Sequence, residues 1–193
     1  MFGQTQPIRS SEVNLYKERI QTLHVSLGIP KEYLEHSKQL LCVEPAQLVS
    51  TEPDCYGRRQ RLTPEAFEAW SNMKQSAIND GVTVFLISAF RDAQYQHDLI
   101  ARKISEGRSL EQILRVNAAP GFSEHHTGRA VDLGTHDCEA LEEEFEQTDA
   151  FVWLERNAKS FGFAMSYPRG NASGFAYEPW HWCFESAETE KEI

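Results

Sequence analysis

No apolar run in this 193-residue sequence approaches the ~20 residues that a transmembrane helix needs. The first residues, Met1 to Pro7, also lack the basic start and the apolar core of a secretion signal. The sequence therefore predicts no transmembrane segment, and at face value it predicts a cytoplasmic location. A periplasmic or cell-envelope location stays open as the alternative.

Cysteine is scarce, and the four residues Cys42, Cys55, Cys138 and Cys183 lie far apart. They lack the paired spacing of a structural zinc site, so we expect thiols. Cys42 and Cys55 are the one pair close enough in sequence to suggest a disulfide, which would matter in an exported protein.

An excess of basic charge is also missing. The formal net charge is −10, and the residues from His136 onward contain thirteen acidic against four basic side chains. This distribution disfavours nucleic-acid binding. The content of 40% hydrophobic and 25% charged residues is ordinary for a globular protein, and the length allows one domain with a sizeable core. The composition thus predicts a single globular domain.

Periodic apolar patterns predict alternating helices and strands. Thr63 and Pro64 are typical of a helix N-cap and first helical position, and Asp149 is a candidate cap for a later helix. We expect helices at residues 11–27, 31–41, 64–79, 93–104, 109–116 and 150–161, and strands at 82–88, 130–133, 163–165, 175–177 and 180–184.

The most informative stretch surrounds Gly128, which interrupts any helix that begins near His125. The alternating residues that follow predict a short strand, in which Val131 and Leu133 face the core and Asp132 faces the opposite side. His125 can then fold back over Gly128 towards Asp132. An imidazole nitrogen and a carboxylate oxygen together suit zinc, which takes three protein ligands in a catalytic site.

A third ligand is available near the end of the chain, where His181 follows Glu178 by three residues. Glu178 is suited to act as the general base of a metal-assisted hydrolysis. Pro179 argues against a helix, and positions three apart on a regular strand face opposite sides, so an irregular start of the strand is required. Spacing alone leaves open whether His125 or His126 is the ligand.

Three motifs together resemble the VanY-like D-alanyl-D-alanine carboxypeptidases, zinc metallopeptidases related to lysostaphin-type enzymes and to the hedgehog domain. The first is Ser-x-His-x-x-Gly-x-Ala-x-Asp at Ser123 to Asp132, and the second is Glu-Pro-Trp-His at Glu178 to His181. The third is Ser-Ala-Phe-Arg at Ser88 to Arg91, with Gln96 downstream. They occur in the order found in the family, and the resemblance covers about residues 62–184.

The resemblance implies a role for each matching residue. One Zn²⁺ would be bound by His125, Asp132 and His181, which selects His125 over His126. Glu178 and Arg91 would be catalytic, and Arg91 would also bind the substrate. Gln96 and Ser123 would complete the substrate contacts.

The resemblance also implies the fold and the domain limits. We expect an α+β fold of the hedgehog and D,D-peptidase type, in which a small, mainly antiparallel sheet carries the zinc site and helices flank it. The zinc peptidase domain would span residues 62–185, with a helical N-terminal extension at residues 1–61 packed on the same domain. Residues 186–193 would form an acidic tail.

The implied function is a zinc-dependent carboxypeptidase that cleaves next to a D-amino acid, of the D-Ala-D-Ala type, in peptidoglycan stem peptides or their fragments. An L,D-carboxypeptidase, a D,D-dipeptidase or an endopeptidase of the same family is the alternative. A non-catalytic, hedgehog-like zinc-binding module is the alternative of another class, and Glu178 argues against it, because a binding module needs no base beside its metal. The oligomeric state stays open.

Overall fold

The computed structural model describes residues 10–37 and 39–185, and these form two compact units. A helical unit contains the residues up to Val43 and Ala93–Ser123, and a sheet unit contains Glu44–Asp92 and the residues from Glu124 onward. The domain boundary between residues 61 and 62 stays a prediction. The acidic tail lies outside the described residues.

The helical unit consists of short and medium helices around a small apolar core. Its helices are α1 (Ser10–Leu27), α2 (Tyr33–His36), α4 (Ala93–Ser105) and α5 (Leu110–Leu114). Helix α4 packs against both α1 and α5. Helix α2 is a single turn instead of the longer helix expected at residues 31–41, because the backbone becomes extended at Ser37. None of the helices in the described ranges combines the length and the apolar character of a membrane span.

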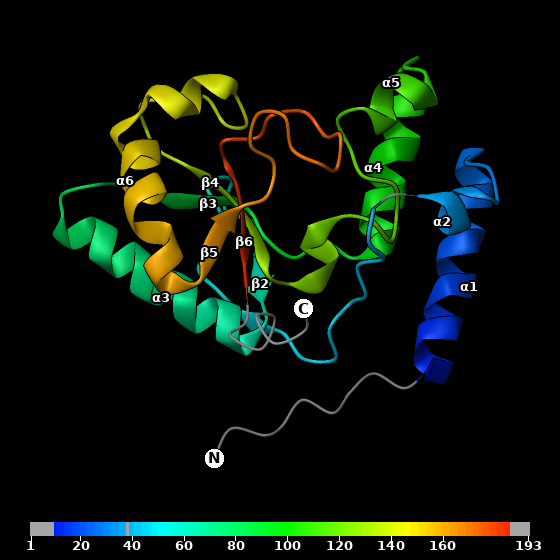
Figure 1. The fold of residues 1–193 in the computed structure, drawn as a ribbon, viewed down its shortest axis with the longest axis horizontal. Coiled ribbons are helices and arrows are strands. Elements are labelled where there is room, and N and C mark those ends of the chain that lie inside the picture. Colours follow the sequence, from blue (N-terminus) through cyan, green and yellow to red (C-terminus); the bar gives the residue numbers. More distant parts are fainter. Residues whose placement is uncertain (1–9, 38, 186–193) are drawn as a thin grey trace. The chain divides into compact units, whose positions relative to one another are not determined.

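The sheet unit holds the two sheets of the protein's described part, both antiparallel (Figure 1). The larger has four strands in the order β3-β4-β6-β5, and β1 and β2 form a separate pair. The helices and strands of the sheet unit are β1 (Val49–Ser50), β2 (Arg61–Leu62), α3 (Pro64–Asn79), β3 (Phe85–Ser88), η1 (Glu124–Thr127), β4 (Ala130–Gly134), η2 (Glu143–Gln147), α6 (Asp149–Asn157), η3 (Ala158–Phe161), β5 (Phe163–Met165) and β6 (His181–Phe184). This arrangement confirms the predicted α+β fold.

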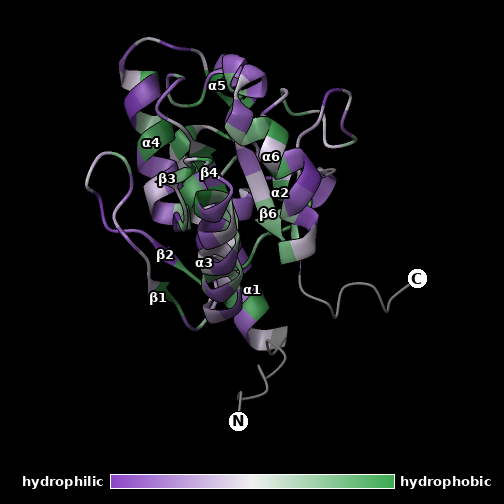
Figure 2. Cartoon of the chain, turned by 90° about the vertical axis from the view of Figure 1, so that its left-hand side faces the viewer, coloured by the Kyte–Doolittle hydropathy of each residue, from purple (hydrophilic) through white to green (hydrophobic). Residues whose placement is uncertain are grey.

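Helices α3 and α6 cover one face of the four-stranded sheet. Helix α3 begins as predicted, with Thr63 accepting a hydrogen bond from the Ala66 N–H, and it buries Trp70 in the core. Its segments alternate between purple and green in Figure 2, as expected of an amphipathic helix. Trp70 belongs to one apolar cluster with Leu133 of β4 and Trp182 of β6.

Side chains alternate between the two faces of a strand, so the residues between the core-facing ones lie on the opposite face of the sheet. In β4, Val131 and Leu133 join the apolar cluster, as predicted, so Asp132 points away from it. Asp132 is paired with His181 across β4 and β6. The two side chains therefore emerge on the same face of neighbouring strands.

Three local expectations in the sheet unit are wrong. Residues 175–177 form no strand, because the preceding turn folds onto them: the Asn171 side-chain amide donates to the Phe175 carbonyl at 3.0 Å. The strand expected at 82–88 begins only at Phe85. Helix α6 is capped by the Thr148 hydroxyl, and Asp149 is its first helical residue.

All four cysteines are thiols, and no disulfide joins Cys42 to Cys55.

Candidate metal centre

Three short elements of the sheet unit supply the candidate ligands. His125 lies on the 3₁₀-helix η1, Asp132 on β4 and His181 on β6. Gly128 separates η1 from β4 and has a φ of 65°, in the left-handed region that favours glycine. The prediction that Gly128 ends a helical turn and turns the chain into a strand is confirmed.

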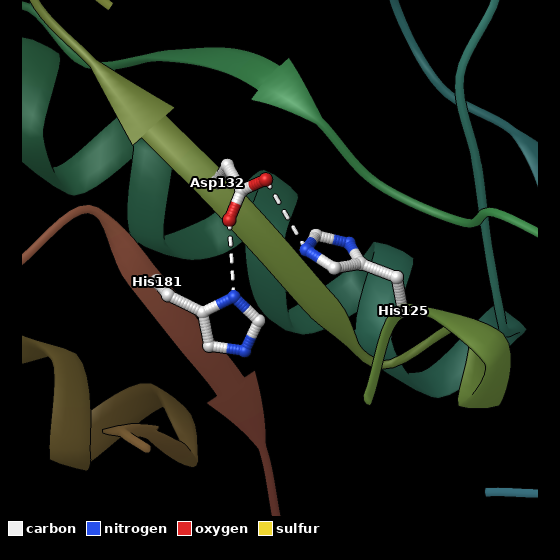
Figure 3. A group of neighbouring side chains, drawn as sticks. All are labelled: His125, Asp132 and His181. Carbon is white, nitrogen blue, oxygen red and sulfur yellow. Dashed lines mark hydrogen bonds and ion pairs between the residues drawn. The ribbon is translucent and has the colours of Figure 1, made fainter. Parts of the chain in front are cut away.

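The three side chains converge on one point. The Asp132 carboxylate lies between the two imidazole rings, as Figure 3 shows. Its Oδ2 is 3.1 Å from His125 Nε2, and its Oδ1 is 3.0 Å from His181 Nδ1. One ligand atom from each residue lies within 4.8 Å of the others, and all three side chains are buried. Two nitrogens and one carboxylate oxygen are the donor set of an open zinc site.

The tautomer of His125 suits a ligand. Its Nδ1 is 2.6 Å from the Ala89 carbonyl oxygen, and since a carbonyl only accepts, Nδ1 carries the proton. Nε2 is buried and makes no hydrogen bond of good geometry in the described part of the chain, so its lone pair faces the convergence point. His126 instead directs Nδ1 to the Arg91 carbonyl. The structure thus places His125, and not His126, beside Asp132.

Burial and mutual charges set the protonation of this group. Burial and the charge of Arg91 lower the pKa of His125 to about 4, so it is neutral. Burial also acts to lower the pKa of His181, but its hydrogen bonds to two carboxylates outweigh this and raise the pKa to about 10. Burial opposes ionisation of Asp132, yet the two histidines hold its pKa well below the usual range. A metal at His181 Nδ1 must displace that proton.

Glu178 lies beside the three candidate ligands, just before β6. The His181 N–H donates to the Glu178 carbonyl at 3.1 Å, which makes a turn around Pro179 and confirms the irregular start of the strand. A Glu178 carboxyl oxygen consequently reaches 3.9 Å from His181 Nδ1. Burial, with the charge of Asp132, raises the pKa of Glu178 to about 7.

Arg91 follows β3 and is locked to η1 by its main chain. Its N–H donates to the His125 carbonyl at 3.3 Å, and its carbonyl accepts from His126. Its side-chain Nε is buried without a hydrogen-bond partner in the described ranges. A buried guanidinium N–H of this kind is available to a bound anion.

Gln96 and Ser123 belong to the helical unit. The Gln96 amide donates to the Ala118 carbonyl at 2.9 Å, and its Oε1 is buried without a partner among the described residues. Ser123 is buried. Their substrate-binding roles stay predictions.

Sequence reasoning missed Glu124, the residue between Ser123 and His125. Its Oε2 lies 3.0 Å from His181 Nε2. The only sequence signal was its place inside the first motif, and nothing local indicates a contact with a histidine 57 positions away.

The comparison with known families decides the relationship. The model of the family described as VanY, D-alanyl-D-alanine carboxypeptidase, matches residues 59–187. The chain belongs to this family. The VanY resemblance of the three sequence motifs is confirmed.

Individual VanY relatives agree with this placement. The chain is 32% identical over 124 residues to a D-alanyl-D-alanine carboxypeptidase of Enterococcus faecium, a match that covers 62% of this chain and 36% of that protein. It spans half or less of the length of that enzyme and of two further curated relatives.

Solved structures share the VanY fold. The LD-carboxypeptidase LdcB superposes with a TM-score of 0.68 at 26% identity, over 77% of this chain and 72% of LdcB. A variant of the vancomycin-resistance D,D-pentapeptidase VanY in complex with Zn(II) superposes with a TM-score of 0.57 at 26% identity, over 77% of this chain and 88% of that one.

Proposed function

We propose that this protein is a zinc-dependent peptidase of the D-alanyl-D-alanine carboxypeptidase type. It cleaves the peptide bond next to a D-amino acid in peptidoglycan stem peptides or their fragments. The observation that carries the proposal is the buried convergence of two imidazoles and a carboxylate, with the Glu178 carboxyl 3.9 Å from His181. Membership of the VanY family supports the same activity.

The donor set fits zinc. His125 Nε2, one Asp132 oxygen and His181 Nδ1 would hold one ion and leave a position for substrate or water. The hydrogen bond from His125 Nδ1 to the Ala89 carbonyl fixes the orientation of the ring and leaves Nε2 free for a metal. When bound, zinc supplies Lewis-acid chemistry, because it polarises the scissile carbonyl and acidifies water.

Glu178 acts as the general base and then as the general acid. Its carboxyl removes the proton from the attacking water and delivers it to the departing amine. The raised pKa of about 7 reflects a carboxyl that is largely, though not fully, removed from water, and a nearby cation would lower it again. The same carboxyl can therefore accept the proton and later donate it.

Arg91 binds negative charge. Its buried, unpartnered Nε can donate to the carboxylate of the substrate or to the charge that develops on the attacked carbonyl. His126 and the η1 main chain hold Arg91 in place. The planar fork of arginine suits either oxygen acceptor.

Substitution of Glu178 tests the mechanism. Glu178→Ala and Glu178→Gln are expected to retain zinc and lose about 10²–10⁴-fold in kcat, the usual contribution of a positioned base. The exposed Glu155→Ala serves as the matched control and keeps full activity. Near-normal turnover by a zinc-loaded Glu178→Ala protein would rule the mechanism out.

The substrate is tested with muropeptides that end in D-Ala-D-Ala, in a single D-Ala or in D-lactate. Release of the terminal D-Ala from D-Ala-D-Ala is the expected result. An L,D-carboxypeptidase is the second candidate, supported by the fold shared with LdcB, and it would act on the muropeptide with a single D-Ala. Inactivity of the wild type on all three would favour the zinc-binding module. The cytoplasmic location stays a prediction.

A further inference from the structure

We infer that Glu124 is a positioning residue of the metal centre. Its carboxylate accepts a hydrogen bond from the His181 Nε2–H and so orients the ring with Nδ1 towards the metal. This inference rests on the proposed function, since it assigns Glu124 a task at the same zinc site. Glu124 itself is outside the ligand set. Its role is to decide which nitrogen of His181 carries the proton.

Two carboxylates bracket the His181 ring. Asp132 Oδ1 lies 3.0 Å from Nδ1, and Glu124 Oε2 lies 3.0 Å from Nε2. The two nitrogens point away from each other, as Figure 3 shows for His181, so Glu124 contacts the ring on the side away from Asp132 and the convergence point. A neutral imidazole carries one proton, and the hydrogen bond at one nitrogen sets which nitrogen is free to bind a metal. With the proton held at Nε2, the Nδ1 lone pair faces the metal.

Glu124 is held in this position by the segment that follows β5. Ser166 directly follows β5, and its hydroxyl donates to the same Oε2 at 2.5 Å. The next residue, Tyr167, packs its ring on that of His181 with the centroids 4.7 Å apart, and its carbonyl accepts from the Glu178 N–H. Residues 166–167 thus fix Glu124, the His181 ring and the Glu178 main chain together. These contacts hold the Glu124 carboxylate in place although 31% of its side chain is exposed.

The two histidine ligands are oriented in different ways. His125 donates its Nδ1–H to the main-chain carbonyl of Ala89, which no substitution removes. His181 donates to the side chain of Glu124, which a single substitution removes. The metal affinity of the centre should therefore be sensitive to residue 124, although residue 124 never touches the metal.

Zinc affinity is the direct readout. Purified full-length variants are titrated with Zn²⁺ against a chelator of known affinity, and the cobalt-substituted proteins are compared by visible absorption, which reports ligand geometry. We expect Glu124→Ala to bind zinc about 10–100-fold more weakly than the wild type, the usual effect of removing the partner of a metal-bound histidine. Glu124→Gln keeps an acceptor oxygen for Nε2–H and is expected to stay within about 5-fold of the wild type. Glu155→Ala, an exposed glutamate of the same unit, is the matched control.

Ser166→Ala is the second variant, in case Glu124→Ala does not fold. It removes only the hydroxyl that holds Glu124, so its zinc affinity should fall in the same direction by a smaller factor. Far-UV circular dichroism establishes that each variant is folded before it is titrated.

The outcomes separate the inference from the proposed function. Failure of the wild type to bind zinc would overturn both. Zinc binding by the wild type, with unchanged affinity and cobalt spectrum in Glu124→Ala, would overturn the inference alone. A Glu124→Gln protein as weak as Glu124→Ala would also overturn it, because charge and not the hydrogen bond would then account for the effect.

Discussion

Gly128→Ala is expected to destabilise the sheet unit at the turn that joins the candidate ligands His125 and Asp132. The residue has a φ of 65°, and its backbone is held on both sides: its N–H donates to the His125 carbonyl, and its carbonyl accepts from the Thr63 N–H at 2.8 Å. A Cβ at this position would lie 2.7 Å from Leu48 Cδ2 and 3.3 Å from Pro45 Cγ. Alanine therefore meets both a strained backbone and crowded surroundings.

The magnitude follows from these two contributions. A non-glycine residue in the left-handed region costs about 1–2 kcal/mol. Overpacking costs about 1–3 kcal/mol, and we expect the lower end because the close Leu48 atom is the tip of a half-buried, rotatable side chain. The free energy of unfolding should fall by about 2–3 kcal/mol, which lowers Tm by about 4–12 °C in a chain of this length.

Gly170→Ala is the matched control, because Gly170 has a similar φ of 74° but nothing within 4 Å of the added Cβ. It should lose only the backbone part, about 1–2 kcal/mol. Urea denaturation of both variants, followed by tryptophan fluorescence in the presence of a chelator, gives the two values without a contribution from bound metal. Equal losses in the two variants would refute the packing argument, and stability equal to the wild type in both would refute the backbone argument as well.

The other predictions concern the metal and the anion site. His125→Ala should lose bound zinc, as measured by metal analysis of the purified protein, whereas His126→Ala should keep it, because His126 contacts the Arg91 carbonyl and not Asp132. Full zinc content in a folded His125→Ala protein would contradict the ligand assignment. Arg91→Lys keeps the charge but loses the planar fork, and it should reduce kcat/KM by about tenfold or more, since a hydrogen bond to a charged group is worth ~1.5–3 kcal/mol. Unchanged steady-state kinetics in Arg91→Lys and Arg91→Ala alike would remove Arg91 from the site.

Much of the candidate site could be predicted because its signals are local in the chain. A glycine that ends a helical turn and a strand of alternating apolar residues place His125 and Asp132 within seven positions of each other, with Asp132 on the side away from the core. The start of α3 at Thr63 and Pro64 was equally local, since a cap depends on a hydroxyl and an N–H three residues apart.

Other local signals were ambiguous, and neighbouring elements decided them. Thr148 and Asp149 are both able to cap α6, and the backbone places the Thr148 hydroxyl at the Phe151 N–H. Residues 175–177 have the composition of a strand. The Phe175 carbonyl, however, accepts its hydrogen bond from the Asn171 side chain and not from a neighbouring strand. Short apolar segments of this kind take their structure from the partners that are available.

The sequence by itself determined the types of candidate ligand, the turn at Gly128 and the face of β4 on which Asp132 lies, because each depends on residues a few positions apart. Only the tertiary structure showed that His125, and not His126, lies beside Asp132, and which side chains contact the His181 ring. Pairing of β4 with β6 sets Asp132 opposite His181, and the same fold brings Glu124 to the other nitrogen of that ring. Strand order and register join residues about 50 positions apart, and the two-residue period of a strand specifies a face but not a partner.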